Sequence, residues 1–122
     1  MMSLADGQLE LYSGNDDQVL PILSLGGLGV ISVLSNVAPK FTHDMVMKYF
    51  DGDIKGATED QLKALPLINA LFSEVNPIPV KTAMNLMGMN VGPLRMPLCE
   101  MEEDTKAALA KEIEKFGLKL AK

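Results

Sequence analysis

The feature that most constrains the fold is a long stretch without charge between Asp17 and Lys40. It is long enough to cross a bilayer, but Pro21, three glycines and several polar residues interrupt it. Residues 28–34 (LGVISVL) are short, β-branched and almost wholly apolar, which is typical of a strand covered on both faces of a parallel sheet. The stretch therefore predicts a short helix over 19–25, a glycine stop and a buried strand, with no membrane span.

The segments on either side extend this pattern. Residues 9–13 begin with alternating apolar and polar residues and read as a second short strand. After residues 28–34, Pro39 can open a helix and Gly52 can stop it. The apolar stripe of that helix is Phe41, Met45 and Tyr49. The order strand, helix, strand, helix is that of a βαβ unit with one further helix.

From Asp53 onward the composition predicts helices alone. Asp53 can cap a long helix running to about Val75, and Pro66 should kink it. We expect its buried stripe to be Leu62, Leu65, Ile68, Leu71 and Phe72. Pro79 begins another helix that Gly88 ends, and the two prolines in residues 91–99 indicate an extended linker. A last helix follows the acidic residues near Glu102, with an apolar face of Leu109, Ile113, Phe116 and Leu120.

Three segments follow from these patterns. We interpret residues 1–8 as an expression leader or tag, residues 9–52 as an α/β part and residues 53–122 as a helical subdomain. The chain has 122 residues, of which 48% are hydrophobic and 22% charged, so it can bury a modest core and is not a disordered chain.

Charge and cysteine content exclude several function classes. The net charge is −5, without a basic stripe, which argues against nucleic acid and against anionic membranes as partners. The single cysteine, Cys99, cannot form an internal disulfide, and a reducing cytoplasm is the expected compartment. His43 is the only histidine and reads as a solvated surface residue, and no cluster has metal-ligand spacing. We expect no metal and no cofactor.

The lysines decide whether this chain can form a Schiff base. Such a lysine should be desolvated so that its pKa falls, yet none of the ten lysines lies in either predicted strand. Nine of them read as exposed, and Lys81, which follows a rigid proline turn, is expected in a salt bridge at a helix end. The sequence therefore offers no catalytic residue.

Four stretches, taken in this order and spacing, are similar to the dihydrodipicolinate synthase family. They are residues 12–17 (YSGNDD), 29–37 (GVISVLSNV), 76–81 (NPIPVK) and 94–98 (LRMPL). The resemblance covers nearly everything after about residue 8. The N-acetylneuraminate lyases share the fold of this pyruvate aldolase superfamily, but residues 76–81 look more like the synthases.

The resemblance implies a fold that is α/β but mostly helical. Residues 9–13 and 28–34 would be the last two strands of a TIM (β/α)8 barrel, in the last two β/α units, and the helical part from residue 53 would be the appended C-terminal domain. Gly14 and Ile31 match positions that line the pyruvate pocket in the family. A missing Cβ at Gly14 would let the backbone approach a ligand. The alternatives are a plain turn glycine for Gly14 and plain barrel core for Ile31.

What does not match the family is equally informative. The Schiff-base lysine, the proton-relay tyrosine, the carboxylate-binding arginine and the threonine pair of the family all precede the matched region. A full-length relative would condense pyruvate with aspartate semialdehyde in lysine biosynthesis, and we expect this chain alone to be inactive. The alternatives are a non-catalytic oligomerisation or interaction module, and one half of a split aldolase. A homo-oligomer is expected.

Overall fold

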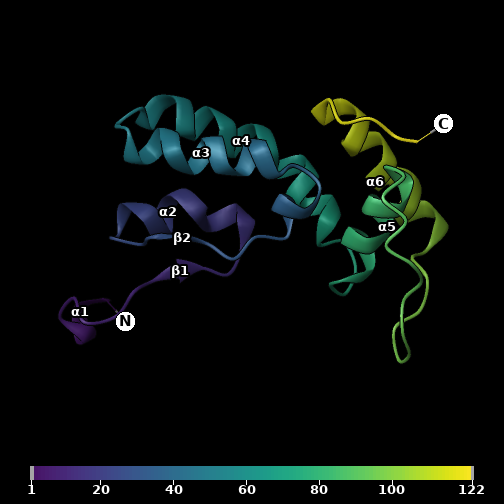
Figure 1. Ribbon diagram of the computed structural model, residues 1–122, viewed down its shortest axis with the longest axis horizontal. Helices are drawn as coiled ribbons and strands as arrows, with labels where there is room; N and C mark the ends of the chain where they lie inside the picture. The colour runs from purple at the N-terminus through teal and green to yellow at the C-terminus, as the bar shows by residue number, and fades with distance from the viewer. Residues whose placement is uncertain (1, 122) are drawn as a thin grey trace.

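The computed structural model describes the backbone of residues 2–121 and the side chains of residues 3–121. Figure 1 shows α3 and α4 side by side over α2 and two short strands, with α5 and α6 gathered at the far end of α4. In chain order the elements are α1 (Met2–Ala5), β1 (Tyr12–Ser13), the 3-10 helix η1 (Asp16–Gln18), α2 (Val19–Ser24), β2 (Gly29–Val30), the 3-10 helix η2 (Leu34–Asn36), α3 (Pro39–Phe50), α4 (Ile54–Leu71), α5 (Ile78–Leu86) and α6 (Glu103–Phe116).

The two strands are parallel neighbours, in register Tyr12 with Gly29 and Ser13 with Val30. One further backbone hydrogen bond lies at each end of the pair, from Leu28 N to Leu11 O (2.7 Å) and from Ile31 N to Ser13 O (2.8 Å). Both strands lie where the sequence predicts them.

The strands are shorter than predicted, and the length of the second one in particular is wrong. The strand ends at Val30, the last backbone hydrogen bond across the pair comes from Ile31 N, and the last residue of the predicted run, Leu34, already belongs to η2. The chain turns there because the Val33 and Leu34 N–H groups donate to the Asp16 carboxylate instead of to a neighbouring strand. A β-branched run thus marks the position of a strand but not its end.

Two helices cover one face of the strand pair. Val19 and Leu23 of α2 and Met45 of α3 are buried together, and Val30 of β2 packs against them. Gly26 ends α2 with a φ of +90°, a backbone conformation that glycine adopts without a steric penalty. The predicted helix over 19–25 and its glycine stop are confirmed.

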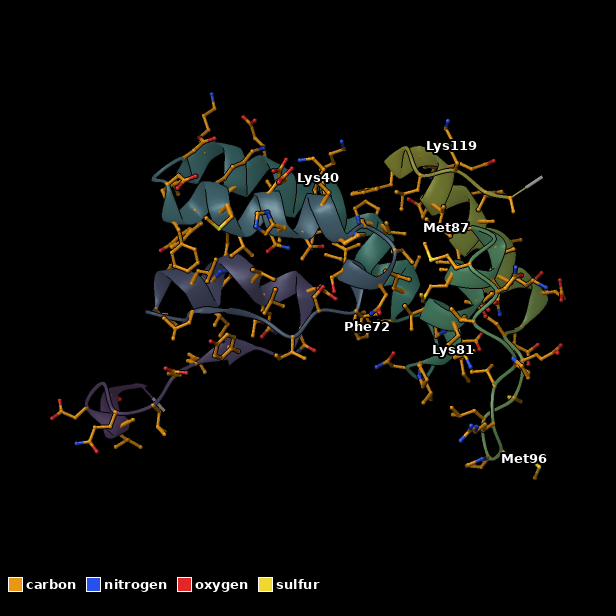
Figure 2. All side chains as sticks on the ribbon, viewed as in Figure 1. Lys40, Phe72, Lys81, Met87, Met96 and Lys119 are labelled. Atoms are coloured by element: carbon orange, nitrogen blue, oxygen red, sulfur yellow. The ribbon has the colours of Figure 1, made fainter. Side chains whose placement is uncertain are left out.

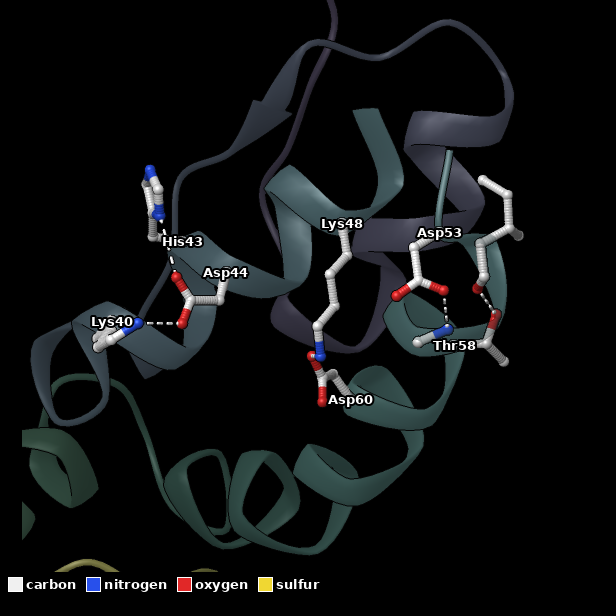
Figure 3. Close-up of polar contacts among 9 residues, drawn as sticks. Lys40, His43, Asp44, Lys48, Asp53, Thr58 and Asp60 are labelled. Atoms are coloured by element: carbon white, nitrogen blue, oxygen red, sulfur yellow. Dashed lines mark hydrogen bonds and ion pairs between the residues drawn. The ribbon is translucent and has the colours of Figure 1, made fainter. Parts of the chain in front are cut away.

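Two polar contacts lie near the start of α4: one caps the helix itself, and the other is an ion pair with α3 (Figure 3). The Asp53 carboxylate accepts from the Gly56 N–H at 2.9 Å, as the sequence predicts for a helix cap. Lys48 Nζ lies 2.6 Å from Asp60 Oδ2, and this hydrogen bond raises the pKa of Lys48 above its ordinary value. The bounds of α3, from Pro39 to just before Gly52, are also confirmed.

The buried face of α4 differs from the predicted stripe. Leu62 is 60% exposed and Phe72 is 39% exposed, so both predictions are wrong. The helix instead buries small or polar residues along one side and large ones only near its end: Ala57, Gln61, Ala64, Leu67, Ile68 and Leu71. A search for large apolar residues selects the wrong face because the first half of this helix packs closely on α2 and α3 through alanines and a hydrogen-bonded glutamine.

The second half of α4 forms the larger core with α5, α6 and η2. Leu67, Leu71, Ala83, Leu109 and Ile113 are buried there together. Helix α6 ends at Phe116 because Gly117 takes a φ of +99°, so Leu120 packs from the tail and not from the helix as predicted. Helix α4 packs in this larger core and also bonds to Asp16 and Leu20 through Gln61, and the division of the chain at residue 53 stays a prediction. No helix within the described residues is long and apolar enough to cross a membrane.

Two glycines should respond in opposite ways to a methyl group. A Cβ at Gly27 would lie 2.6 Å from Ile22 Cγ2 and 2.7 Å from Ile22 O, whereas a Cβ at Gly14 would meet nothing within 4 Å. We expect Gly27→Ala to lower the free energy of unfolding by about 1–3 kcal/mol through overpacking. Gly14→Ala should leave it unchanged or raise it slightly, because alanine restricts the unfolded chain. Urea unfolding monitored by circular dichroism measures both, and equal losses at the two positions would contradict this packing.

Candidate functional site

The candidate site is the edge at which both parallel strands end. Gly14 directly follows β1 and Ile31 directly follows β2, and the Ile31 N–H donates to Ser13 O across the pair at 2.8 Å. The two residues singled out by the sequence therefore lie side by side. Ligands of parallel α/β folds bind at the carboxyl ends of the strands, which is the edge that these two residues occupy.

Gly14 leaves open space at this edge. Its φ lies outside the left-handed region, and an added Cβ would meet no atom within 4 Å. A glycine required by a left-handed turn would have a positive φ, so this form of the turn alternative is wrong. The open space is compatible with a ligand that approaches the backbone, and a ligand-lining role for Gly14 stays a prediction.

Ile31 presents its side chain outward. It is 72% exposed in this chain, and the alternative of plain barrel core, which concerns a complete barrel, stays open. Its backbone is nevertheless held, because Ser13 O accepts from its N–H and the residues that follow it are bonded to Asp16. An exposed apolar side chain on a fixed backbone can line a pocket, and that role too stays a prediction.

Asp16 is a buried charged residue of this edge that the sequence analysis did not single out. It is only 1% exposed, and its carboxylate accepts from Ser32 Oγ (2.5 Å), Val33 N (2.9 Å) and Leu34 N (2.9 Å). The sequence shows Asp16 and Asp17 only as an acidic pair before a helix, and nothing in it distinguishes the buried member from the exposed one.

Gln61 joins this edge to α4. Its Nε2 donates to Asp16 O at 2.8 Å and its Oε1 accepts from Leu20 N at 3.3 Å. It is 6% exposed, and both ends of its amide are therefore used inside the protein. Hydrophobic periodicity selects only apolar residues, so it could not identify Gln61 as a buried, hydrogen-bonded residue.

Lys81 takes a different role from the one predicted. Its Nζ donates to Pro93 O at 2.6 Å, and it takes part in no ion pair found within residues 2–121, so the predicted salt bridge is wrong. Asn85, one turn further along α5, accepts from Val91 N at 2.9 Å. Together they fasten the segment that carries the exposed Met96 at its tip, which Figure 2 shows pointing away from the molecule. They also line a cavity of about 300 Å³ beside α6.

The other reactive side chains stay apart from the strand ends. His43 is exposed, with its Nδ1 3.4 Å from Asp44 Oδ1, and the hydrogen bonds from Lys40 and then His43 hold the pKa of Asp44 below its ordinary value. Cys99 is exposed in the segment before α6. No group of three or more His, Cys, Asp or Glu in the described part of the chain could hold a metal ion. The described edge can thus line a ligand through backbone and apolar groups, and no described lysine, cysteine or histidine lies on β1 or β2.

Comparisons with known proteins agree with the resemblance found in the sequence. A model of the dihydrodipicolinate synthetase family matches residues 1–116. The 4-hydroxy-tetrahydrodipicolinate synthase of Lachnoclostridium phytofermentans is 62% identical over 113 residues, covering 93% of this chain and 38% of that relative.

Solved structures of the same kind match the fold. The dihydrodipicolinate synthase of Thermotoga maritima superposes with a TM-score of 0.88 at 45% identity, over 90% of this chain and 37% of that one. That of Acinetobacter baumannii, crystallised with pyruvate, superposes with a TM-score of 0.90 at 32% identity, over 97% of this chain and 40% of that one. The chain thus spans about two fifths of the length of the relatives it matches.

Proposed function

The chain belongs to the dihydrodipicolinate synthetase family, and from this we propose that it acts as the C-terminal part of a 4-hydroxy-tetrahydrodipicolinate synthase. The observation that carries the proposal is the pairing of Ile31 N with Ser13 O, because it sets the two family pocket positions beside each other. In the complete enzyme this edge would face pyruvate, the ligand named with the solved relative from Acinetobacter baumannii.

The fold part of the proposal is that β1 and β2 are the last two strands of a (β/α)8 barrel. Support comes from their parallel pairing and from α2, which connects them as a barrel helix would. The helical region from α4 onward would be the domain appended to that barrel. The unpaired outer edges of β1 and β2 would then be covered by strands from the remaining three fifths of the enzyme.

The chemistry of the complete enzyme would be a lysine-catalysed aldol condensation. The lysine amine attacks the ketone carbon of pyruvate, water leaves and an imine forms, and the derived enamine then attacks aspartate semialdehyde. Gly14 would leave room for the bound pyruvate, and Ile31 would supply an apolar wall. No lysine of residues 3–121 lies on β1 or β2, so we propose that the chain by itself does not form the imine.

An alternative proposal is that the chain completes a split barrel or serves as an interaction module. It is supported by apolar side chains exposed along the strand pair, namely Leu9, Tyr12, Leu28 and Ile31. Such a surface calls for a cover, and a second copy or an N-terminal partner chain would supply it. We propose a homo-oligomer in the cytoplasm as the working state of the complete enzyme.

Trapping the imine tests the proposed inactivity. The 122-residue chain is incubated with pyruvate and sodium borohydride, which reduces an imine to a stable amine, and its intact mass is measured. We expect no stoichiometric pyruvyl adduct, because no described lysine lies at the strand ends. The lysines with hydrogen-bond partners donate to carboxylates or to a backbone carbonyl elsewhere. A single-site adduct would contradict the proposal, and a complete synthase of the family serves as the positive control.

Self-association tests whether the strand edges need a cover. At micromolar concentration we expect light scattering to give a mass at least twice that of the 13.2 kDa chain, because β1 and β2 expose unpaired edges and apolar side chains. Ile31→Lys should weaken the association by adding a charge to this edge, and Leu62→Lys, on the outer face of α4, is the matched control. A stable monomer would count against this expectation.

Substitution of Gly14 tests the pocket role in a complete synthase that carries this sequence. Gly14→Val should raise the KM for pyruvate or block imine formation while the melting temperature stays within a few degrees, because the side chain would fill open space next to the ligand. Pyruvate kinetics and thermal unfolding are measured together. A lowered melting temperature with unchanged pyruvate kinetics would remove Gly14 from the pocket.

A further inference from the structure

We propose that Asp16 and Gln61 are positioning residues for the pocket edge formed by Gly14 and Ile31. The inference rests on the proposed function, because it assigns the task of these residues within that site. It differs from a pocket-lining role, since neither residue is free to face a ligand: Asp16 is 1% exposed and Gln61 is 6% exposed.

The first step is the turn that follows Ile31. The Asp16 carboxylate accepts from Val33 N and Leu34 N at 2.9 Å each, and from Ser32 Oγ at 2.5 Å. Ser32 Oγ in turn accepts from Ser35 N at 2.8 Å. These bonds satisfy the first amides of η2 and hold the chain directly after Ile31, while Ser13 O holds it directly before.

The second step is that Asp16 follows Gly14 by two residues. The turn between them is bonded as well, because Ser13 Oγ donates to Asn15 O at 2.7 Å. A single buried carboxylate therefore joins the segment leaving β1 to the segment leaving β2. Hydrogen bonds to a charged acceptor are stronger than neutral ones, so the distance between Gly14 and Ile31 is set firmly.

The third step brings in the helical region. Gln61 lies on α4, 45 residues away from Asp16 in sequence, and its Nε2 donates to Asp16 O at 2.8 Å. Its Oε1 accepts from Leu20 N at 3.3 Å, so one amide group holds both the start of α2 and the Asp16 backbone. Through Gln61, α4 supports the strand edge from behind.

The functional consequence follows from the sensitivity of imine formation to geometry. A pocket edge that shifts by a fraction of an ångström binds pyruvate less well and presents its carbonyl at a poorer angle. The loss should appear in the pyruvate half-reaction, because Gly14 and Ile31 line that ligand. The second substrate should be affected less.

The test uses a complete synthase that carries this sequence as its C-terminal part. Gln61→Met removes both hydrogen bonds and keeps the length of the side chain, and Asp16→Asn keeps the shape of the carboxylate but turns an amide toward the donors. Ser32→Ala, which removes one donor to Asp16 and the acceptor of Ser35 N, replaces Asp16→Asn if that variant does not fold. Asp17→Asn and Leu62→Gln are matched controls, because each is the exposed neighbour of a proposed residue.

We expect the KM for pyruvate to rise roughly threefold to tenfold in the Asp16 and Gln61 variants, as the loss of one or two hydrogen bonds implies. The KM for aspartate semialdehyde should stay within about twofold of the control values, which is the scatter expected of surface substitutions. Pyruvate KM values equal to those of the controls would overturn the inference. So would equal losses for both substrates, because that pattern indicates a general structural role.

The proposed function and this inference can fail separately. If the unsubstituted synthase forms no borohydride-trapped adduct with pyruvate, the proposed function fails and the inference falls with it. If that adduct forms and the Asp16 and Gln61 variants bind pyruvate as the controls do, only the positioning role is overturned.

Discussion

The rest of the α/β part depends on the hydrogen bonds that the Asp16 carboxylate accepts. It is buried without a cationic partner among the described ion pairs, and three donors from residues 32–34 satisfy it. A buried charge is tolerated only when hydrogen bonds replace its water, so these contacts are strongly coupled. These hydrogen bonds lie where β2 ends and η2 begins, and they connect the segments that follow the two strands.

Helix α4 contacts both the α/β part and the helical region. Its first half bonds to Asp16 and α2 through Gln61 and to α3 through Asp60, and its second half packs in the larger core. At the junction Lys63 Nζ lies 5.8 Å from the Phe41 ring centre and 5.5 Å from that of Phe116, and the two rings pack edge to face. Contacts of a cation with aromatic ring faces are favourable even at exposed sites, although less so than in the interior. The two parts of the chain are therefore packed together through α4, through η2 and through the Phe41–Phe116 contact.

Membership of the dihydrodipicolinate synthetase family suggests a role for the strand edge. The strand edge has an open glycine, an exposed isoleucine and no described lysine, as the proposed pocket wall without a reactive group would have. The matched relatives are about two and a half times as long, so a complete enzyme has room for that group elsewhere. Binding walls and reactive groups that come from different strands are the usual organisation of a barrel active site.

The sequence alone predicted several helix boundaries, because Pro39, Gly52 and Asp53 act through their own backbone and side-chain geometry. It also indicated the family, and through that resemblance Gly14 and Ile31 as expected pocket positions. Only the tertiary structure decided which face of α4 is buried, which of two adjacent aspartates is buried and what Lys81 bonds. Those outcomes depend on partners 12 to 45 residues away, and such pairings arise from packing that no local pattern encodes.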